Sequence, residues 1–311
     1  MQKYNSIIIL GPTGSGKTEL SIKLAKQLNG EIINADSMQI YKYFNIGTAK
    51  PSLQEREEIP HHLMDFLEPT EDFSVSEYKK LCLKLCEELI NKQKLPIIVG
   101  GTGFYIDSLL KNYSYGNASK DASIRKKYQD LYENYGKEYI YNILKTVDVD
   151  SANKLHPNDV KRVIRALEIY ETTQKNKSLS NKEDFQNEQP SFLKPLIIGL
   201  NYEREELYQR INKRVDIMVE NGLIEEVNSI LNTYDTNLQA MKAIGYKELF
   251  SYLKGEETLE NALEKIKQNS RNYAKRQITW FKRNKDINWF NKSEISENQI
   301  FDEILKLYNE N

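Results

Sequence analysis

The segment SIIILGPTGSGKT, residues 6–18, constrains the fold of this chain more than any other part of its sequence. Its apolar run Ile7–Leu10, rich in β-branched residues, predicts a buried parallel strand. The next residues, Gly11–Thr18, fit the phosphate-loop pattern G-x-x-x-x-G-K-S/T, and leucines at helical spacing predict a helix from Lys17 to about Leu28. A strand, a glycine-rich loop and a helix in this order predict a site for a di- or triphosphate.

Each residue type in this loop has a physical use in holding phosphate. Glycines let the backbone curl so that successive N–H groups point inward, and the start of the following helix adds partial positive charge. Lys17 supplies a full positive charge, and the Thr18 hydroxyl is a candidate Mg²⁺ ligand. The residues expected to hold phosphate are Gly11, Thr13, Gly14, Ser15, Gly16, Lys17 and Thr18.

Further apolar segments predict a sheet around the first strand. Strands are expected over residues 31–36, 62–66, 95–103 and 194–201, and a helix is expected from Ser74 to Lys92. Strands that alternate with helices indicate a parallel sheet covered on both faces. The predicted fold class is therefore α/β, with a parallel sheet core like that of P-loop NTPases.

The strand pattern stops between about Tyr113 and Pro190 and gives way to helical patterns and a polar run, residues 172–191, expected to be an exposed loop. We therefore expect a core formed by residues 1–112 and 191–311, with a helical insertion domain over 113–190. From Glu203 onward the core is expected to be mostly helical.

Composition limits the classes of partner. The 311 residues carry a formal net charge of −1, so any surface for a polyanion must be a local patch. The longest apolar run near the start, Ile7–Leu10, is too short for a signal peptide or a membrane span, which favours a cytoplasmic protein that does not contact membranes. Cys82 and Cys86 are expected to be buried thiols on one helix face.

Ligands of an open parallel sheet lie beyond the carboxyl ends of its strands. Asp36 and Ser37 follow one predicted strand and Gly100–Thr102 ends another, so both segments should face the phosphate loop. Asp36 alone is compatible with a helix cap, but beside a phosphate loop it is a candidate general base or metal partner. A strand that ends in glycines and a threonine, without a carboxylate, argues against an ATPase unless Asp36 or Asp65 replaces that carboxylate.

Basic residues cluster in the segment RNYAKRQITWFKRNK, residues 271–285, which contains no acidic residue. If it is helical throughout, Arg271, Lys275, Lys282 and Lys285 form one stripe with aromatic residues between them. Cations interleaved with aromatic rings suit an RNA backbone and an unstacked base. A membrane-surface helix is the competing interpretation, but the aromatic residues do not segregate to one face.

Two other segments carry clustered cations. In HPNDVKRVIRALEIY, Pro157 is expected at the first helical position, with valine, isoleucine and leucine on the core face and Lys161, Arg162 and Arg165 on the opposite face. In the helix after residue 201, one of Arg210, Lys213 and Arg214 is expected to reach the phosphate site.

Taken together, these motifs resemble the tRNA dimethylallyltransferase family, also called IPP transferases, over nearly the whole chain. The motifs appear in order as GPTGSGKT, NADSMQIYKYFNIGTAKP, PHHLMDF, IIVGGTGFYIDSLL, HPNDVKRVIRALEIY, RVDIMVENGLIEEV, AIGYKEL and YAKRQITWFKR. Two residues depart from the family pattern: Gly14 stands where alanine is common, and Lys161 stands where glutamine is usual.

The resemblance implies that the loop holds the diphosphate of dimethylallyl diphosphate, not ATP, and that the enzyme uses Mg²⁺. It implies catalytic roles for Asp36 as proton acceptor, for Thr102 as donor to the bridging oxygen, and for Lys17 and Arg214 as cations on the leaving group. The insertion would clamp the anticodon stem of tRNA. The implied tRNA-binding residues are Asp36, Ser37, Met38, Gln39, Thr102, Lys161, Arg162, Val163, Ile164, Arg165, Lys242, Gly245, Tyr246, Lys247, Lys275, Arg276, Gln277, Trp280 and Lys282.

Three alternatives stay open at this point. A related enzyme could prenylate free adenine nucleotides, although such a substrate needs neither the insertion nor the basic segment. A kinase could use the same loop for ATP, and an RNA-binding protein could use it as a nucleotide switch without catalysis. For the tRNA-modifying enzyme that the resemblance implies, a monomer is expected.

Overall fold

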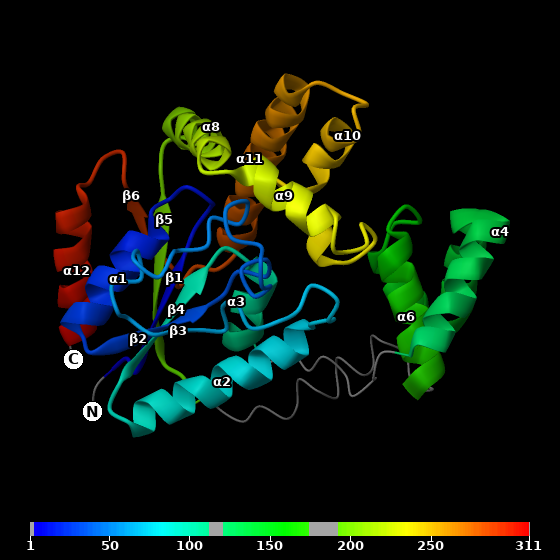
Figure 1. Cartoon of the computed structure of the whole chain (residues 1–311). Coiled ribbons are helices and arrows are strands. Elements are labelled where there is room, and N and C mark those ends of the chain that lie inside the picture. Colours follow the sequence, from blue (N-terminus) through cyan, green and yellow to red (C-terminus); the bar gives the residue numbers. More distant parts are fainter. Residues whose placement is uncertain (1–2, 112–120, 174–191, 311) are drawn as a thin grey trace. The chain divides into compact units, whose positions relative to one another are not determined.

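The computed structural model describes residues 3–111, 121–173 and 192–310, and these residues form two compact units (Figure 1). The first unit comprises Met1–Leu109 together with Ser191–Asn311, and the second comprises Leu110–Pro190. Most of the polar run expected to be an exposed loop, residues 174–191, lies outside the described residues. The two units are described separately below.

The first unit is built on a six-stranded parallel sheet with the strand order β3-β2-β4-β1-β5-β6. This arrangement confirms the predicted α/β class. The central strand β1 pairs Ile8 with Ile98 on one side and with Ile197 on the other. The strands are β1 (Ser6–Leu10), β2 (Gly30–Asn34), β3 (His61–His62), β4 (Leu95–Gly100), β5 (Pro195–Asn201) and β6 (Asn288–Asn291).

The two edge strands differ from the prediction. The strand expected over residues 62–66 is only His61–His62, because the chain turns at Leu63 and Asp65, whose φ angles are 54° and 60°. Strand β6 was not predicted at all. It has four residues, of which only Phe290 is buried, and two asparagines conceal its apolar pattern.

Helices cover both faces of the sheet, α1 and α12 on one face and α2 and α3 on the other, while α8 to α11 gather at one end (Figure 1). The predicted helix over 74–92 is α2, with Ser74 as its N-cap in a capping box with Glu77. Its two cysteines are buried free thiols, as predicted. The helices are α1 (Lys17–Gln27), α2 (Val75–Asn91), α3 (Gly103–Leu110), α8 (Arg204–Glu220), α9 (Leu223–Leu231), η1 (Ala240–Lys242), η2 (Lys247–Leu249), α10 (Phe250–Leu253), α11 (Leu259–Phe281) and α12 (Glu297–Asn309).

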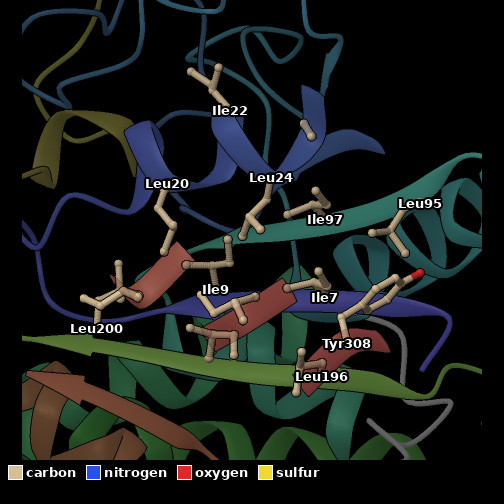
Figure 2. Packing of buried hydrophobic residues seen from close by; sticks show 14 of the residues in the cluster. Ile7, Ile9, Leu20, Ile22, Leu24, Leu95, Ile97, Leu196, Leu200 and Tyr308 are labelled. Carbon is tan, nitrogen blue, oxygen red and sulfur yellow. The ribbon is translucent and has the colours of Figure 1, made fainter. Parts of the chain in front are cut away.

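The hydrophobic core under α1 and α12 fixes the strand from which the phosphate loop starts. Figure 2 shows Leu20 and Leu24 of α1 above Ile7 and Ile9 of β1, with side chains of β4, β5 and α12 around them. Ile7, Ile9 and Leu24 are completely buried. Each such side chain contributes about 1.5–3 kcal/mol by leaving water, so the start of the phosphate loop is firmly held.

The second unit is helical, as expected for the inserted segment, with α4 (Ala122–Val147), α5 (Val149–Lys154) and α6 (Val160–Thr173). Helix α4 is interrupted at Gly136, whose φ of 81° is non-helical. The prediction that Pro157 opens a helix is wrong, because residues 156–159 form a turn, closed by a hydrogen bond from Asp159 N–H to the His156 carbonyl, and α6 begins at Val160. Across the described ranges of both units, no helix is long and apolar enough to cross a membrane.

Candidate active site

The phosphate loop has the shape that the sequence predicts. Gly14 and Gly16 take left-handed φ angles of 81° and 80°, which L side chains rarely adopt. The Lys17 amine lies over the loop, 3.0 Å from the Gly11 carbonyl and 2.7 Å from the Pro12 carbonyl. The Ser15 hydroxyl is buried and has no hydrogen-bond partner among the described residues. A buried donor left in this state fits a loop that is completed by an anion.

The pKa of Lys17 is lowered to about 7, first by burial and then by the positive charge of Arg214. The negative charge of Asp36 acts in the opposite direction. Three charged groups that the sequence separates by up to 197 positions therefore act on one another at the end of β1. An anion bound here would favour the charged form of Lys17.

Asp36 and Thr102 are held at the carboxyl ends of β2 and β4. Asp36 Oδ1 accepts a hydrogen bond from Met38 N–H at 2.9 Å, and Asn34 holds the Asp36 backbone from both sides. The Thr102 hydroxyl accepts from Ser37 N–H at 3.0 Å and donates to the Ser37 hydroxyl at 3.2 Å. Thr102 must give up this second bond before it can donate to a leaving group.

Two cavities meet at Asp36, one of about 970 Å³ and one of about 330 Å³, and Thr102 is not among the residues that line them. The larger cavity contains the phosphate loop from Thr13 to Glu19, except Ser15, and the α8 cations. The smaller one is lined by Lys242 and Lys247 of the AIGYK segment and by Tyr273 and Arg276 of α11. Both cavities are lined by Thr13, Asp36, Thr48, Ala49, Arg214 and Met218. A ligand in one can thus meet a ligand in the other beside Asp36.

The three cations of α8 near the cavities have different surroundings. Arg214 lines both cavities, and burial lowers its pKa against the opposing effects of Asp36 and Glu55. A guanidinium remains charged in proteins, so Arg214 is a fixed cation at the junction. Arg210 instead bonds the Gly14 carbonyl at 3.1 Å and packs over the Tyr202 ring. Lys213 lines only the larger cavity.

Sequence reasoning missed a carboxylate that orders the wall of both cavities. Glu226 of α9 accepts hydrogen bonds from the backbone N–H groups of Asn45, Ile46 and Gly47 and from the Tyr246 hydroxyl. The Gln39 amide holds the next residues of the same loop through the carbonyls of Thr48 and Ala49. The sequence motif LIEEV contains Glu226, but nothing in it marks this residue, since the backbone groups that it binds are about 180 positions away.

The predicted RNA-binding residues of the first unit separate into exposed and buried groups. Exposed side chains belong to Lys242, Lys247, Lys275, Arg276 and Lys282. Trp280 and the segment Ser37–Gln39 are partly exposed, whereas Gly245, Tyr246 and Gln277 are buried. Tyr246 packs on Phe44, and burial raises its pKa, with the charge of Glu226 acting in the same direction. A side-chain contact of Tyr246 or Gln277 with RNA on an open surface is therefore not supported.

The basic stripe predicted over residues 271–285 is shorter than expected. Helix α11 ends at Phe281, with Lys282 as its C-cap in a helical conformation, so Lys282 still continues the helix whereas Lys285 lies beyond it. Arg271 bonds the Asn212 side chain of α8 at 2.6 Å. The cations that the helix itself exposes in this segment are Lys275 and Arg276.

In the second unit, Lys161 and Arg162 of α6 are exposed, as predicted. Val163 and Ile164 are buried in the core of that unit, which rules them out as surface contacts through their side chains. Arg165 and Arg125 both pair with the buried Glu168, 3.0 Å and 2.8 Å away. Burial would raise the pKa of Glu168, but these arginines outweigh it and lower the pKa. Arg165 thus stabilises the fold of the second unit by pairing with a buried carboxylate.

Comparison with known proteins shows the family to which this chain belongs. The family model described as IPP transferase matches residues 39–284. The chain belongs to the IPP transferase family. It is 48% identical over 305 residues to the tRNA dimethylallyltransferase of Acetivibrio thermocellus, covering 98% of this chain and 97% of that relative. It is 49% identical over 302 residues to that of Halothermothrix orenii, covering 97% and 92%.

Solved structures of IPP transferases agree. The tRNA delta(2)-isopentenylpyrophosphate transferase of Staphylococcus epidermidis is 46% identical with a TM-score of 0.72, over 98% of this chain and 99% of that one. A eukaryotic dimethylallyltransferase, described as acting on tRNA, is 34% identical with a TM-score of 0.83, over 98% and 79%. In this IPP transferase, Gly14 suits its left-handed φ better than the alanine common at that position.

The residues around the loop fit Mg²⁺ bound together with a diphosphate. The Thr18 hydroxyl is exposed into the larger cavity, which Glu19, Asp36 and Asp65 also line. Within the described residues no group of three or more His, Cys, Asp or Glu side chains forms a metal site by itself. Mg²⁺ characteristically binds through few protein ligands plus substrate phosphates and water, so a protein cage is not required.

Proposed function

We propose that this chain transfers a dimethylallyl group from dimethylallyl diphosphate to the exocyclic amine of the adenine on the 3′ side of the anticodon in tRNA, releasing diphosphate. The observation that carries the proposal is the junction of the two cavities at Asp36 and Arg214. One cavity contains the phosphate loop and the other is lined by exposed cations. The names of the full-length relatives support the same reaction.

The phosphate loop would hold the diphosphate. Its N–H groups, the Ser15 hydroxyl and the Lys17 amine would surround the phosphate oxygens, and Arg214 would face the end at which the bond to carbon breaks. Mg²⁺ held at Thr18 would neutralise part of the charge that the leaving diphosphate develops. An allylic carbon stabilises positive charge by itself, so this chain's cations act mainly on the leaving group.

The acceptor adenine would enter the smaller cavity after it is flipped out of the anticodon loop. Asp36, fixed through one carboxylate oxygen by Met38 N–H, would hold the exocyclic amine and accept its proton. Thr102 would turn from Ser37 toward the bridging oxygen and donate to it as the bond breaks. Lys275, Arg276 and Lys282 of the first unit and Lys161 and Arg162 of the second would contact the RNA backbone.

The decisive experiment mixes the purified protein with Mg²⁺, labelled dimethylallyl diphosphate and unmodified tRNA, with adenosine monophosphate as a competing acceptor and no ATP. We expect label in tRNA alone. Label in the mononucleotide would indicate an enzyme acting on free nucleotides. Label in neither acceptor would refute prenyl transfer and would favour ATP as the ligand of the phosphate loop. We expect the reaction to take place in the cytoplasm, by a monomer, and size-exclusion chromatography with light scattering tests the second expectation.

A further inference from the structure

The side chain of Gln277 connects the phosphate loop to the turn after β4. Its Oε1 accepts a hydrogen bond from Thr13 N–H at 3.0 Å, and its Nε2 donates to the Gly101 carbonyl at 2.9 Å. Thr13 and Gly101 are 264 and 176 positions away along the chain. One carboxamide, 4% exposed, therefore joins α11 to two loops at the same edge of the sheet.

The chemistry of this connection requires an uncharged amide. One end must accept and the other must donate, which a carboxylate or an ammonium group cannot do. Gly101 leaves the space for it, since a Cβ atom there would lie 2.1 Å from Nε2. The same Cβ would lie 3.4 Å from the Gly11 carbonyl of the phosphate loop. The two loops and the carboxamide are thus packed against one another with no room for a larger residue.

Both polar ends of Gln277 are directed at backbone, whereas its neighbours on α11 are directed outward. Lys275 and Arg276 are exposed, and Gln277 lines the larger cavity beside Thr13 and Gly14. Consecutive residues of one helix therefore face different surroundings. The family motif places all three in one tRNA-binding segment, and the geometry separates them.

We propose that Gln277 is a positioning residue that holds the phosphate loop in its anion-binding shape before the diphosphate arrives, and that it does not contact tRNA. The inference rests on the proposed function only in taking diphosphate as the anion. A loop of glycines has many conformations to lose, and binding is weakened by whatever ordering remains to be done when the ligand arrives. Fixing Thr13 N–H removes part of that cost in the free protein.

The test compares Gln277→Met, which keeps the length of the side chain and removes both hydrogen bonds, with the wild type. Affinity for inorganic pyrophosphate with Mg²⁺ is measured by calorimetry without tRNA, and affinity for unmodified tRNA by filter binding. We expect pyrophosphate to bind about tenfold more weakly and tRNA affinity to change less than twofold. Thr279→Ala, exposed on the same helix, serves as the control and should change neither affinity.

A second measurement follows the loop directly. Hydrogen exchange of the peptide containing residues 11–18 should accelerate in Gln277→Met while the peptides of β1 and α1 exchange as in the wild type. If Gln277→Met does not fold, Gln277→Asn decides, because it keeps an uncharged amide but is one methylene too short to reach both Thr13 N–H and the Gly101 carbonyl. Unchanged pyrophosphate affinity in a folded variant overturns the proposal, as does a loss confined to tRNA. Failure of the wild type itself to bind pyrophosphate would instead refute the proposed function.

Discussion

Lys17 and Arg214 are cations partly removed from water in the free protein. Burial lowers the pKa of both, and the two positive charges oppose each other across the site. Desolvated cations of this kind are unfavourable until an anion joins them, so the free site is prepared for a diphosphate at some cost to itself. Lys17 is the group that can relieve this cost by losing its proton, which gives binding a measurable pH dependence.

We predict that diphosphate binding takes up a proton at Lys17. With a folded-state pKa lowered to about 7, the amine is mostly neutral at pH 8, and the anion favours the charged form. The contribution of Lys17 to affinity therefore falls as pH rises through about 7. Calorimetry at pH 8 in two buffers of different ionisation enthalpy counts the protons. Lys17→Arg, always charged, should take up about one proton fewer than the wild type; equal uptake would contradict the prediction.

Asp36→Asn should separate chemistry from binding. The amide keeps an oxygen for Met38 N–H but cannot accept the proton of the attacking amine. We expect turnover to fall by about 10²–10⁴ and pyrophosphate affinity to stay within a few-fold of the wild type. Asp302→Asn, an exposed aspartate of α12 that lines neither cavity, is the control and should retain the turnover. Equal losses of turnover and affinity at Asp36 would argue against its role as proton acceptor.

At the scale of elements, helix α9 supports the loop that walls both cavities. Glu226 accepts three backbone N–H groups from residues 45–47, an arrangement that binds a carboxylate tightly because each hydrogen bond is charge-assisted. The side chains of Phe44 and Ile46 in this loop pack in the hydrophobic cluster that includes Val227 of α9, and Glu226 binds the backbone N–H groups beside them. The active-site wall is therefore built by a helix that itself contributes no catalytic group.

Glu226→Gln should loosen this wall. The amide keeps one acceptor and turns an NH₂ group toward backbone donors, so we expect the free energy of unfolding to fall by about 1–3 kcal/mol. KM for tRNA should rise as well, because Thr48 and Ala49 line the smaller cavity. Chemical denaturation and steady-state kinetics measure the two effects. Glu225→Gln, its exposed neighbour, is the matched control, and similar behaviour of the two variants would show that the anchor is unimportant.

The cations at the end of α11 predict how tRNA binding depends on salt concentration. Lys275→Glu combined with Lys282→Glu should weaken tRNA binding and reduce the slope of log affinity against log salt by about one for each lost phosphate contact. The control reverses Lys80 and Lys84, two exposed lysines of α2. Filter binding at several salt concentrations gives both slopes. A slope that does not change in the α11 variant would place the RNA surface elsewhere.

At the scale of the whole molecule, the sequence predicted what depends on local pattern. The phosphate loop and the buried strands β1, β2, β4 and β5 lie where residue periodicity placed them. Short polar elements such as β6 were not predicted, since four residues give too little periodicity to detect. Glu226 and the contacts of Gln277 with the phosphate loop could not have been found, because the partners of both residues are brought to them only by the fold. The end of α11 was also misjudged, since no glycine or proline follows Phe281 to mark it.

The two units each expose cations, Lys275 and Lys282 in the first and Lys161 and Arg162 in the second. If one tRNA contacts both, each set contributes to the same binding free energy, and the sets act independently because they share no side chain. We predict that reversing Lys161 and Arg162 weakens tRNA binding, leaves pyrophosphate affinity unchanged, and adds to the effect of the Lys275 and Lys282 reversal within about 0.5 kcal/mol. A double-mutant cycle measured by filter binding provides all of these values. Reversal of Lys126, exposed on α4, is the control for general charge. Wild-type tRNA affinity in the Lys161 and Arg162 variant would mean that this face of the insertion does not meet the RNA.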